Sequence, residues 1–384
     1  MQRSCSLVLA LGALLGCGLH SDLGNSSDAG LRGDGGYPTS NWIAGYYAGW
    51  TQDACPPSAI DYSALTEVIH FSVIPKADGT LDITTNLGQR HIAPAVATAH
   101  AAGVPILITV GGANSQSLFQ QASSDGNRAT FVGNLVNFMR TNGYDGIDVD
   151  WEAHNVAYDS ALFATLIHDL RQALSAISPR PLLTAPVNSH PTDYAAAIAD
   201  LDQIGLMTYE MSGAYAGWIT WHSGPLFNGG LTFPNHASEQ LPSIDLVVSA
   251  ALDAGVPASK LGFGIGFTGQ VWTGGVYAPL QSWTVAPAVK SEAFNTLVDQ
   301  YFDGGVQLWD SPAHVPYVSF HPASSAEDRF ISYEDPHSIA DKLAYLKTRG
   351  LGGAIIWNIG DGYLNPATHA PPFDPLLQAV KYHR

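Results

Sequence analysis

Four acidic side chains occur within eight residues, in the segment 145–152 with the sequence DGIDVDWE. Asp148, Asp150 and Glu152 alternate with apolar residues, and side chains two residues apart lie on the same face of a β-strand. In a strand the three carboxyl groups would form a row with a spacing of about 6.6 Å. Neighbouring buried carboxyl groups share protons, and the pKa of at least one rises. Such a row can keep one acid protonated near neutral pH, and Glu152 is the candidate general acid.

Two other interpretations of this row are a solvated strand end and a metal site. A solvated end does not require the strict alternation of acidic and apolar residues. A metal site usually recruits histidines or further carboxylates from neighbouring strands. His70 could contribute, but a single histidine within an apolar run is more often a hydrogen-bonded core residue. Catalysis is the favoured interpretation, and neither a metal nor an organic cofactor is expected.

The composition argues against negatively charged partners. The 384 residues include 16 Lys and Arg against 33 Asp and Glu, which gives a net charge of −17. Nucleic acids and anionic membrane surfaces attract clustered basic residues, so neither is an expected partner. Cys5 and Cys17 lie in the N-terminal segment, which leaves Cys55 without an intrachain disulfide partner. Nothing in the sequence indicates an oligomer, and a monomer is the default expectation.

Residues 1–17 have the features of an export signal. Arg3 precedes the apolar run 7–15, which is too short to span a bilayer but matches the apolar region of a signal peptide. The run ends in LLGC, which resembles the processing site of bacterial lipoproteins and makes Cys17 the candidate for lipidation. An ordinary secretory signal is the alternative. Residues 18–40, rich in Gly, Ser and Asp, predict a flexible linker before a secreted or cell-envelope-anchored domain.

Residues 41–384 alternate short apolar runs with amphipathic stretches of helical periodicity. Eight apolar strands separated by helices predict a closed parallel (β/α)8 TIM barrel, with its active site at the carboxyl ends of the strands. The last connection differs, because residues 270–335 are rich in Trp, Tyr and Pro and predict a small α+β insertion between strands seven and eight. The expected strands are 42–47, 67–73, 105–110, 144–150, 182–187, 203–209, 261–267 and 353–359. The expected helices are 89–103, 128–143, 158–177, 238–255, 336–350 and 373–384.

The segment DGIDVDWE resembles the DxxDxDxE signature of glycoside hydrolase family 18, the chitinases and their relatives. The resemblance extends over nearly all of residues 41–384. GYYAGW at 45–50, TVGG at 109–112, MTYE at 207–210 and GAIIW at 353–357 are similar to other characteristic strands of this family. The insertion resembles the α+β subdomain found in many of these chitinases.

The resemblance implies a hydrolase that cleaves β-1,4 links between N-acetylglucosamine units of chitin. The substrate's own acetamide would be the nucleophile, and the configuration would be retained, an exception to the two-carboxylate scheme. Glu152 would protonate the glycosidic oxygen and later activate water. Asp150 would orient the acetamide, Asp148 would share charge with Asp150, and Tyr209 would donate a hydrogen bond to the acetamide carbonyl. The expected substrate-binding residues are Tyr46, Trp50, Gly111, Gly112, Met207, Glu210, Trp218 and Trp357.

Three positions depart from the family pattern. Glu210 stands where Asp is usual, Ala113 follows two glycines where many chitinases have Trp, and Ala153 stands where Tyr is common. Two alternative functions use the same fold: an endo-β-N-acetylglucosaminidase that acts on N-glycans, and a lectin that binds chitin without cleaving it. Such lectins typically lose the acid at the position of Glu152, which is present here. The insertion favours a deep groove for a linear polymer, so an endo-acting chitinase is the leading prediction.

Overall fold

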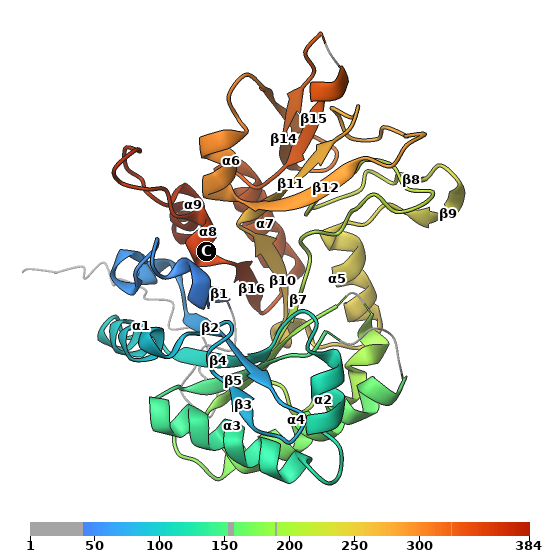
Figure 1. Ribbon diagram of the computed structural model, residues 1–384. Coiled ribbons are helices and arrows are strands. Elements are labelled where there is room, and N and C mark those ends of the chain that lie inside the picture. Colours follow the sequence, from blue (N-terminus) through green and yellow to red (C-terminus); the bar gives the residue numbers. More distant parts are fainter. Residues whose placement is uncertain (1–40, 153–156, 189, 324) are drawn as a thin grey trace, which may run out of the picture.

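The computed structural model describes residues 41–152, 157–188, 190–323 and 325–384. The predicted export signal, linker and lipidation site at residues 1–40, and the departure at residue 153, lie outside these ranges. The body of the protein is a barrel of parallel strands in the order β1-β16-β10-β7-β6-β5-β4-β2, and pairing of β1 with β2 closes it (Figure 1). The predicted eight-stranded barrel is confirmed. Its strands are Trp42–Ala48 (β1), Glu67–Pro75 (β2), Ile106–Gly111 (β4), Gly146–Asp150 (β5), Leu182–Val187 (β6), Gln203–Leu206 (β7), Leu261–Gly266 (β10) and Gly353–Trp357 (β16).

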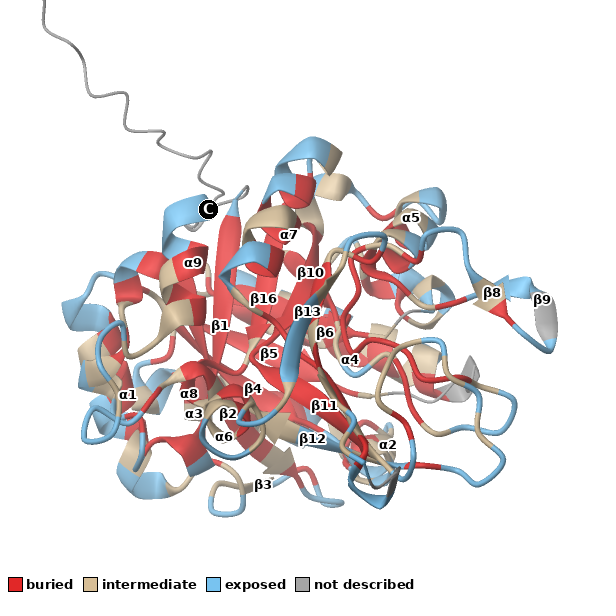
Figure 2. Ribbon diagram, turned by 90° about the horizontal axis from the view of Figure 1, so that it is seen from above, coloured by how far each residue is buried: buried red, intermediate tan, exposed pale blue. Residues whose placement is uncertain are grey.

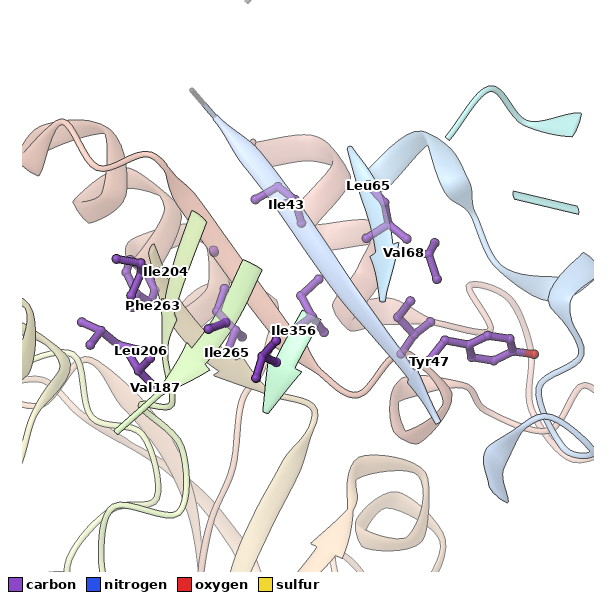
Figure 3. Close-up of a cluster of buried hydrophobic side chains, with 14 of the residues drawn as sticks. Ile43, Tyr47, Leu65, Val68, Val187, Ile204, Leu206, Phe263, Ile265 and Ile356 are labelled. Carbon is purple, nitrogen blue, oxygen red and sulfur yellow. The ribbon is translucent and has the colours of Figure 1, made fainter. Parts of the chain in front are cut away.

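Each barrel strand has two buried faces. Val68, Ile204 and Ile356 belong to the large outer cluster, which packs between the strands and the helices (Figure 3). Residues of the opposite parity, such as Ile69 and Ile355, form a separate cluster inside the barrel. This two-sided burial explains why the strands are nearly continuous apolar runs in the sequence. A polar side chain on the inner face is therefore an exception that needs a partner or a function.

Helices cover the outside of the barrel at most of the predicted places. The predicted helix 238–255 begins later, because Pro242 interrupts it and Ser243 caps a helix that starts at Ile244, while residues before Pro242 form β9. The short helices α2 and α8 were not predicted, and α8 begins at the last residue of the predicted strand 353–359. Within the described ranges, no helix is both long and apolar enough to cross a membrane. The helices are Gln89–Ala101 (α1), Gln116–Ala122 (α2), Arg128–Asn142 (α3), Ala157–Ser175 (α4), Ile244–Asp253 (α5), Phe294–Gln300 (α6), Pro336–Arg349 (α7), Ile359–Gly362 (α8) and Pro375–His383 (α9).

The predicted α+β insertion between the seventh and eighth barrel strands is confirmed. It begins directly after the carboxyl end of β10 and forms an antiparallel sheet in the order β12-β11-β15-β14-β13, accompanied by α6 (Figure 1). Its edge strand β13 is largely exposed, in contrast to the buried barrel strands (Figure 2). Because it grows from a carboxyl end, the insertion stands on the face where barrel enzymes carry their active sites. The minor strands are Leu81–Asp82 (β3), Thr232–Phe233 (β8), His236–Gln240 (β9), Thr268–Thr273 (β11), Ala288–Ala293 (β12), Val306–Asp310 (β13), Val315–Phe320 (β14) and Arg329–Ser332 (β15).

Candidate active site

The acidic row lies on β5 with the parity that the sequence predicts. Ile147 and Val149 pack in the outer cluster, whereas Asp148 and Asp150 point into the barrel and are buried. Trp151 lies in the outer layer, where its ring is parallel to that of Phe119 at 4.7 Å. The row therefore rises along the barrel axis towards the carboxyl ends of the strands.

Two glycines on β4 allow the backbone to approach β5 closely. Gly111 pairs with Asp150, and a Cβ atom at Gly111 would lie 2.2 Å from the Asp150 carbonyl oxygen. The φ angles of Gly111 and Gly112 are both 109°, a backbone conformation that residues with a side chain rarely adopt. The Gly112 N–H donates to the Asp150 carbonyl at 3.0 Å. The structure thus places these two predicted binding residues behind Asp150, as backbone supports of the acidic strand.

Asp148 is held by three hydroxyl groups from three other strands. Its carboxylate accepts hydrogen bonds from Tyr46 at 3.0 Å, Thr109 at 3.1 Å and Thr184 at 2.6 Å. Burial raises the pKa of Asp148 to about 6, and the three donors limit this rise. Asp148 is therefore a fixed, ionisable support for the row. Tyr46, an expected substrate-binding residue, is buried; its hydroxyl lies beside Asp148, and its ring lies 5.6 Å from that of Trp357.

Asp150 has a contrasting environment. Its Oδ1 atom is buried, and no atom in the described part of the chain forms a hydrogen bond with it. Burial raises the pKa of Asp150 well above its usual value, and the neighbouring Glu152 and Asp148 raise it further. Two carboxyl groups that repel in this way retain a proton between them to a higher pH than either would alone. Asp150 can consequently share a proton with Glu152 and accept a hydrogen bond from a bound ligand.

A cavity of about 480 Å³ opens above this row. It brings together most of the predicted site residues from the ends of different strands. Glu152 is partly exposed there, while Asp150 forms part of the lining from below. Phe71 and Asn86 also line the cavity although the sequence did not single them out. The lining residues are Trp50, Phe71, Asn86, Ala113, Asp150, Glu152, Met207, Tyr209, Glu210 and Trp357.

Aromatic rings form one side of the cavity around Trp357. The Tyr209 ring is nearly parallel to the Trp357 ring, with a centroid distance of 6.4 Å. Phe71 meets Trp357 edge to face at 4.8 Å, and Trp50 does so at 6.3 Å. Trp50 is 55% exposed and so presents a free aromatic surface at the rim. These faces can contact the apolar faces of a sugar ring, while Tyr209 contributes a hydroxyl group.

Glu210, the substitution for the usual Asp, reaches the insertion. Its backbone φ angle is 55°, and its N–H donates to Ser223 Oγ at 3.1 Å. Its carboxylate accepts a hydrogen bond of 2.5 Å from Ser291 Oγ on β12. The longer side chain thereby links the barrel wall of the cavity to the insertion sheet. Met207 lies in the same wall, where its N–H donates to the Val187 carbonyl at 2.9 Å.

The structure places Trp218 apart from the cavity lining. Its ring packs against Phe233 at 4.6 Å, in a small cluster that also contains Trp221. The neighbouring Tyr215 is 60% exposed. Trp218 was expected near the substrate only because it follows Tyr209 closely in the chain. Closeness in sequence does not show which way a loop side chain points.

A matched pair of substitutions tests this difference. We expect Trp357→Ala to lower kcat/KM on soluble oligosaccharides by about 10- to 100-fold, since a lost aromatic contact of this size corresponds to roughly 1.5–3 kcal/mol. Trp218→Ala should leave kcat/KM within about threefold of wild type while lowering thermal stability. Equal kinetic losses in both variants would contradict this placement of Trp218. Steady-state kinetics and thermal unfolding of both proteins provide the measurement.

The surroundings of His70 and Cys55 indicate that both residues have structural roles. His70 is buried on the outer side of β2, between Gln52 at 2.6 Å and the Tyr144 hydroxyl at 2.9 Å, and burial lowers its pKa to about 3. Burial raises the pKa of the Cys55 thiol to about 12, so the thiol is uncharged at neutral pH. Among the residues that the structure describes, no group of three or more His, Cys, Asp or Glu side chains could hold a metal ion.

Comparison with known proteins agrees with this architecture. The family model for glycosyl hydrolases family 18 matches residues 42–362, so the chain belongs to this family. A probable endochitinase of Caenorhabditis elegans is 29% identical over 270 residues, which are 63% of this chain and 41% of that protein. Chitinase A1 of Niallia circulans is 31% identical over 287 residues, 66% of this chain and 40% of that protein. The chain thus spans about two-fifths of the length of these two relatives.

A solved structure shows that the same fold occurs in a protein described as a pseudo-chitinase. Human YKL-39, described as a pseudo-chitinase with retained chitooligosaccharide-binding properties, superposes with a TM-score of 0.75. Its sequence is 22% identical, and the match covers 90% of this chain and 99% of that one. The likeness establishes the fold. Since the fold is shared with a protein of this kind, the activity has to be argued from the side chains.

Proposed function

We propose that this protein is a retaining chitinase that hydrolyses β-1,4 links between N-acetylglucosamine units. One observation carries the proposal: Asp150, Glu152 and Tyr209 lie in a single cavity, and Asp150 has a buried oxygen with no partner in the described ranges. An oxygen in this state suits the N–H of a bound acetamide group. The aromatic faces of Trp357 and Trp50 suit the sugar rings on either side.

In the first step, Glu152 donates its proton to the glycosidic oxygen as the bond from C1 to that oxygen breaks. The acetamide carbonyl oxygen of the same sugar forms a new bond to C1, and the positive charge moves to the acetamide nitrogen. Asp150 accepts the hydrogen bond of that N–H and stabilises the charge, while the Tyr209 hydroxyl orients the carbonyl oxygen. This sequence needs no carboxylate nucleophile.

In the second step, the ionised Glu152 takes a proton from water, and the water oxygen attacks C1. The oxazolinium ring opens, the acetamide is restored, and Glu152 is again protonated. Both displacements invert C1, so the product retains the β configuration. The raised pKa of Asp150 helps this cycle because it favours keeping a proton on the pair formed by Asp150 and Glu152.

Product analysis of the purified domain on chitotetraose and chitohexaose tests the proposal. We expect chitobiose release, with the β-anomer formed before mutarotation. An N-glycosylated glycoprotein should be included in parallel, because cleavage of its glycans without cleavage of chitin oligomers would assign the protein as an endo-β-N-acetylglucosaminidase. Binding without cleavage of any substrate would assign it as a lectin.

The lectin alternative has support from the pseudo-chitinase relative, and the endo-glycosidase alternative uses the same chemistry. The lectin alternative is disfavoured because Glu152 is present and lies in the same cavity as Asp150 and Tyr209. The insertion stands at the carboxyl ends of the strands, and a wall at that place favours a linear polymer over a branched glycan core. We therefore infer that the substrate is chitin and that the protein is an endo-acting hydrolase of it.

We also propose that the protein is exported and anchored through a lipid on Cys17. The support is the short apolar run 7–15 followed by LLGC. Cys17→Ala should move the protein from the membrane fraction to the soluble exported fraction of a bacterial host, without a change in specific activity. A variant that still partitions with membranes after export would contradict the anchor.

A further inference from the structure

A fourth acidic side chain lies inside the barrel, beneath the three acids of β5. Glu67 is the first residue of β2 and is fully buried. It has the parity of Ile69 and Phe71, which belong to the interior cluster, whereas Val68 packs in the outer cluster. The Glu67 carboxyl group therefore points towards the barrel axis. The proposed reaction does not use this group.

The surroundings of Glu67 do not support a charge. Neither of its carboxyl oxygens makes a hydrogen bond of good geometry in the described part of the chain, and neither does Nε2 of Gln203, the one neighbouring donor, whose side chain lowers the pKa of Glu67. The charged groups that face it are both acidic: Asp148 on β5, and Asp202 immediately before β7. Asp202 is itself paired with two arginines, Arg171 at 2.6 Å and Arg180 at 3.0 Å. Burying an unpaired charge in such a place is costly, so the neutral acid is favoured.

Glu67 and Asp148 therefore differ in protonation. Burial raises the pKa of Glu67 to about 8; the side chain of Gln203 opposes this rise, and the charges of Asp148 and Asp202 add to it. The pKa of Asp148 rises only to about 6, because three hydroxyl groups stabilise its carboxylate. The proton therefore favours Glu67, and the negative charge favours Asp148. This order follows from the donors around each group.

We propose that Glu67 is a positioning residue for catalysis: an uncharged acid at the base of the barrel that lets Asp148 carry charge and that sets the alkaline edge of activity. While Glu67 keeps its proton, Asp148 ionises without a second charge beneath it. When Glu67 loses its proton, the new charge increases the proton affinity of Asp148 and, through it, of Asp150 and Glu152. The row then retains the catalytic proton to a higher pH than three acids alone would.

The activity test compares the pH profiles of wild type and Glu67→Gln on a soluble chitooligosaccharide, and it rests on the proposed hydrolysis. Glutamine keeps the shape and cannot ionise. We expect kcat at the pH optimum to stay within about twofold, and the alkaline limb to move down by roughly half a pH unit or more. Asp374→Asn is the matched control, because Asp374 is a half-buried acid with a raised pKa that caps α9 outside the barrel. Superimposable profiles of wild type and Glu67→Gln would overturn the proposal.

A stability test does not depend on chitin cleavage. An acid whose pKa is near 4.3 in the unfolded chain and about 8 in the folded chain binds an additional proton on folding between these values. Its contribution to stability is therefore greatest below about pH 4.3 and is lost as the pH rises to about 8. The urea midpoint of Glu67→Gln, relative to wild type, should consequently increase with pH across this window.

A midpoint difference that is constant with pH would mean that Glu67 is charged in the folded protein, and would overturn the proposal even for an active enzyme. Glu67→Leu is the second variant if the glutamine variant does not fold, since leucine suits the apolar interior around Ile69. The same pH dependence is expected for it. If the difference between the urea midpoints increases with pH but the protein cleaves no chitin, the uncharged Glu67 is supported and only the proposed hydrolytic activity is rejected.

Discussion

Glu152→Gln should lower kcat on chitooligosaccharides by about 10²- to 10⁴-fold while leaving oligosaccharide binding within a few-fold of wild type. Glutamine has nearly the same size as glutamate but can neither donate the catalytic proton nor accept one from water. Glu152 is partly exposed in the cavity, and its replacement should change the thermal unfolding temperature little. A loss of kcat with an unchanged dissociation constant would identify the interaction as one made in the transition state.

The matched control is Glu239→Gln, which removes a carboxylate from an exposed position on β9. It should have wild-type kinetics, which separates the effect of the missing proton from that of the reduced negative charge. Turnover and tetrasaccharide binding should be measured on both variants by kinetics and calorimetry. Wild-type turnover by Glu152→Gln would remove Glu152 from the role of general acid and would favour a different acid in the cavity.

The acidic row could be predicted from the sequence because it depends on strand periodicity alone. Alternation of Asp148, Asp150 and Glu152 with apolar residues is sufficient to place them on one face, and the structure has that parity. The same rule could have identified Phe71, which lies in the middle of β2 with the same inward parity as Glu67. Strand periodicity also predicts the barrel, since the strands are buried on both sides.

The partners of each acid could not be predicted, because they depend on the register of the closed barrel. Thr184 donates to Asp148 only because β6 pairs with β5 at that residue. Asn86 lies in a connecting segment without periodicity, so no local pattern indicates that it reaches the cavity. Trp218 illustrates the converse, as its place close behind Tyr209 in the chain gave no information about the hydrophobic cluster that takes up its ring. Long-range packing, rather than local propensity, decides these contacts.

The second large effect is expected for Asp150→Asn, with a loss of about 10²- to 10³-fold in kcat. Asparagine keeps an oxygen that can accept the acetamide N–H, but it has no negative charge to stabilise the positive nitrogen of the intermediate. It also cannot share a proton with Glu152. Because Glu152 raises the pKa of Asp150, the two acids interact, and removing the Asp150 charge removes the repulsion that keeps a proton on the pair. The alkaline limb of the remaining activity should therefore move to lower pH.

Asp148→Asn provides the comparison that distinguishes chemistry from support. The Asp148 carboxylate accepts hydrogen bonds from Tyr46, Thr109 and Thr184, and an amide cannot accept all three because its nitrogen is a donor. This variant should lose roughly 1–3 kcal/mol of stability, a cost that Asp150→Asn should largely avoid because Asp150 Oδ1 has no donor in the described ranges. Denaturant unfolding and pH–rate profiles of both proteins would show the separation. If both variants lose similar stability and the alkaline limb does not move in Asp150→Asn, Asp150 supports the fold and does not stabilise the intermediate. The proposed substrate-assisted mechanism would then lack its charged partner.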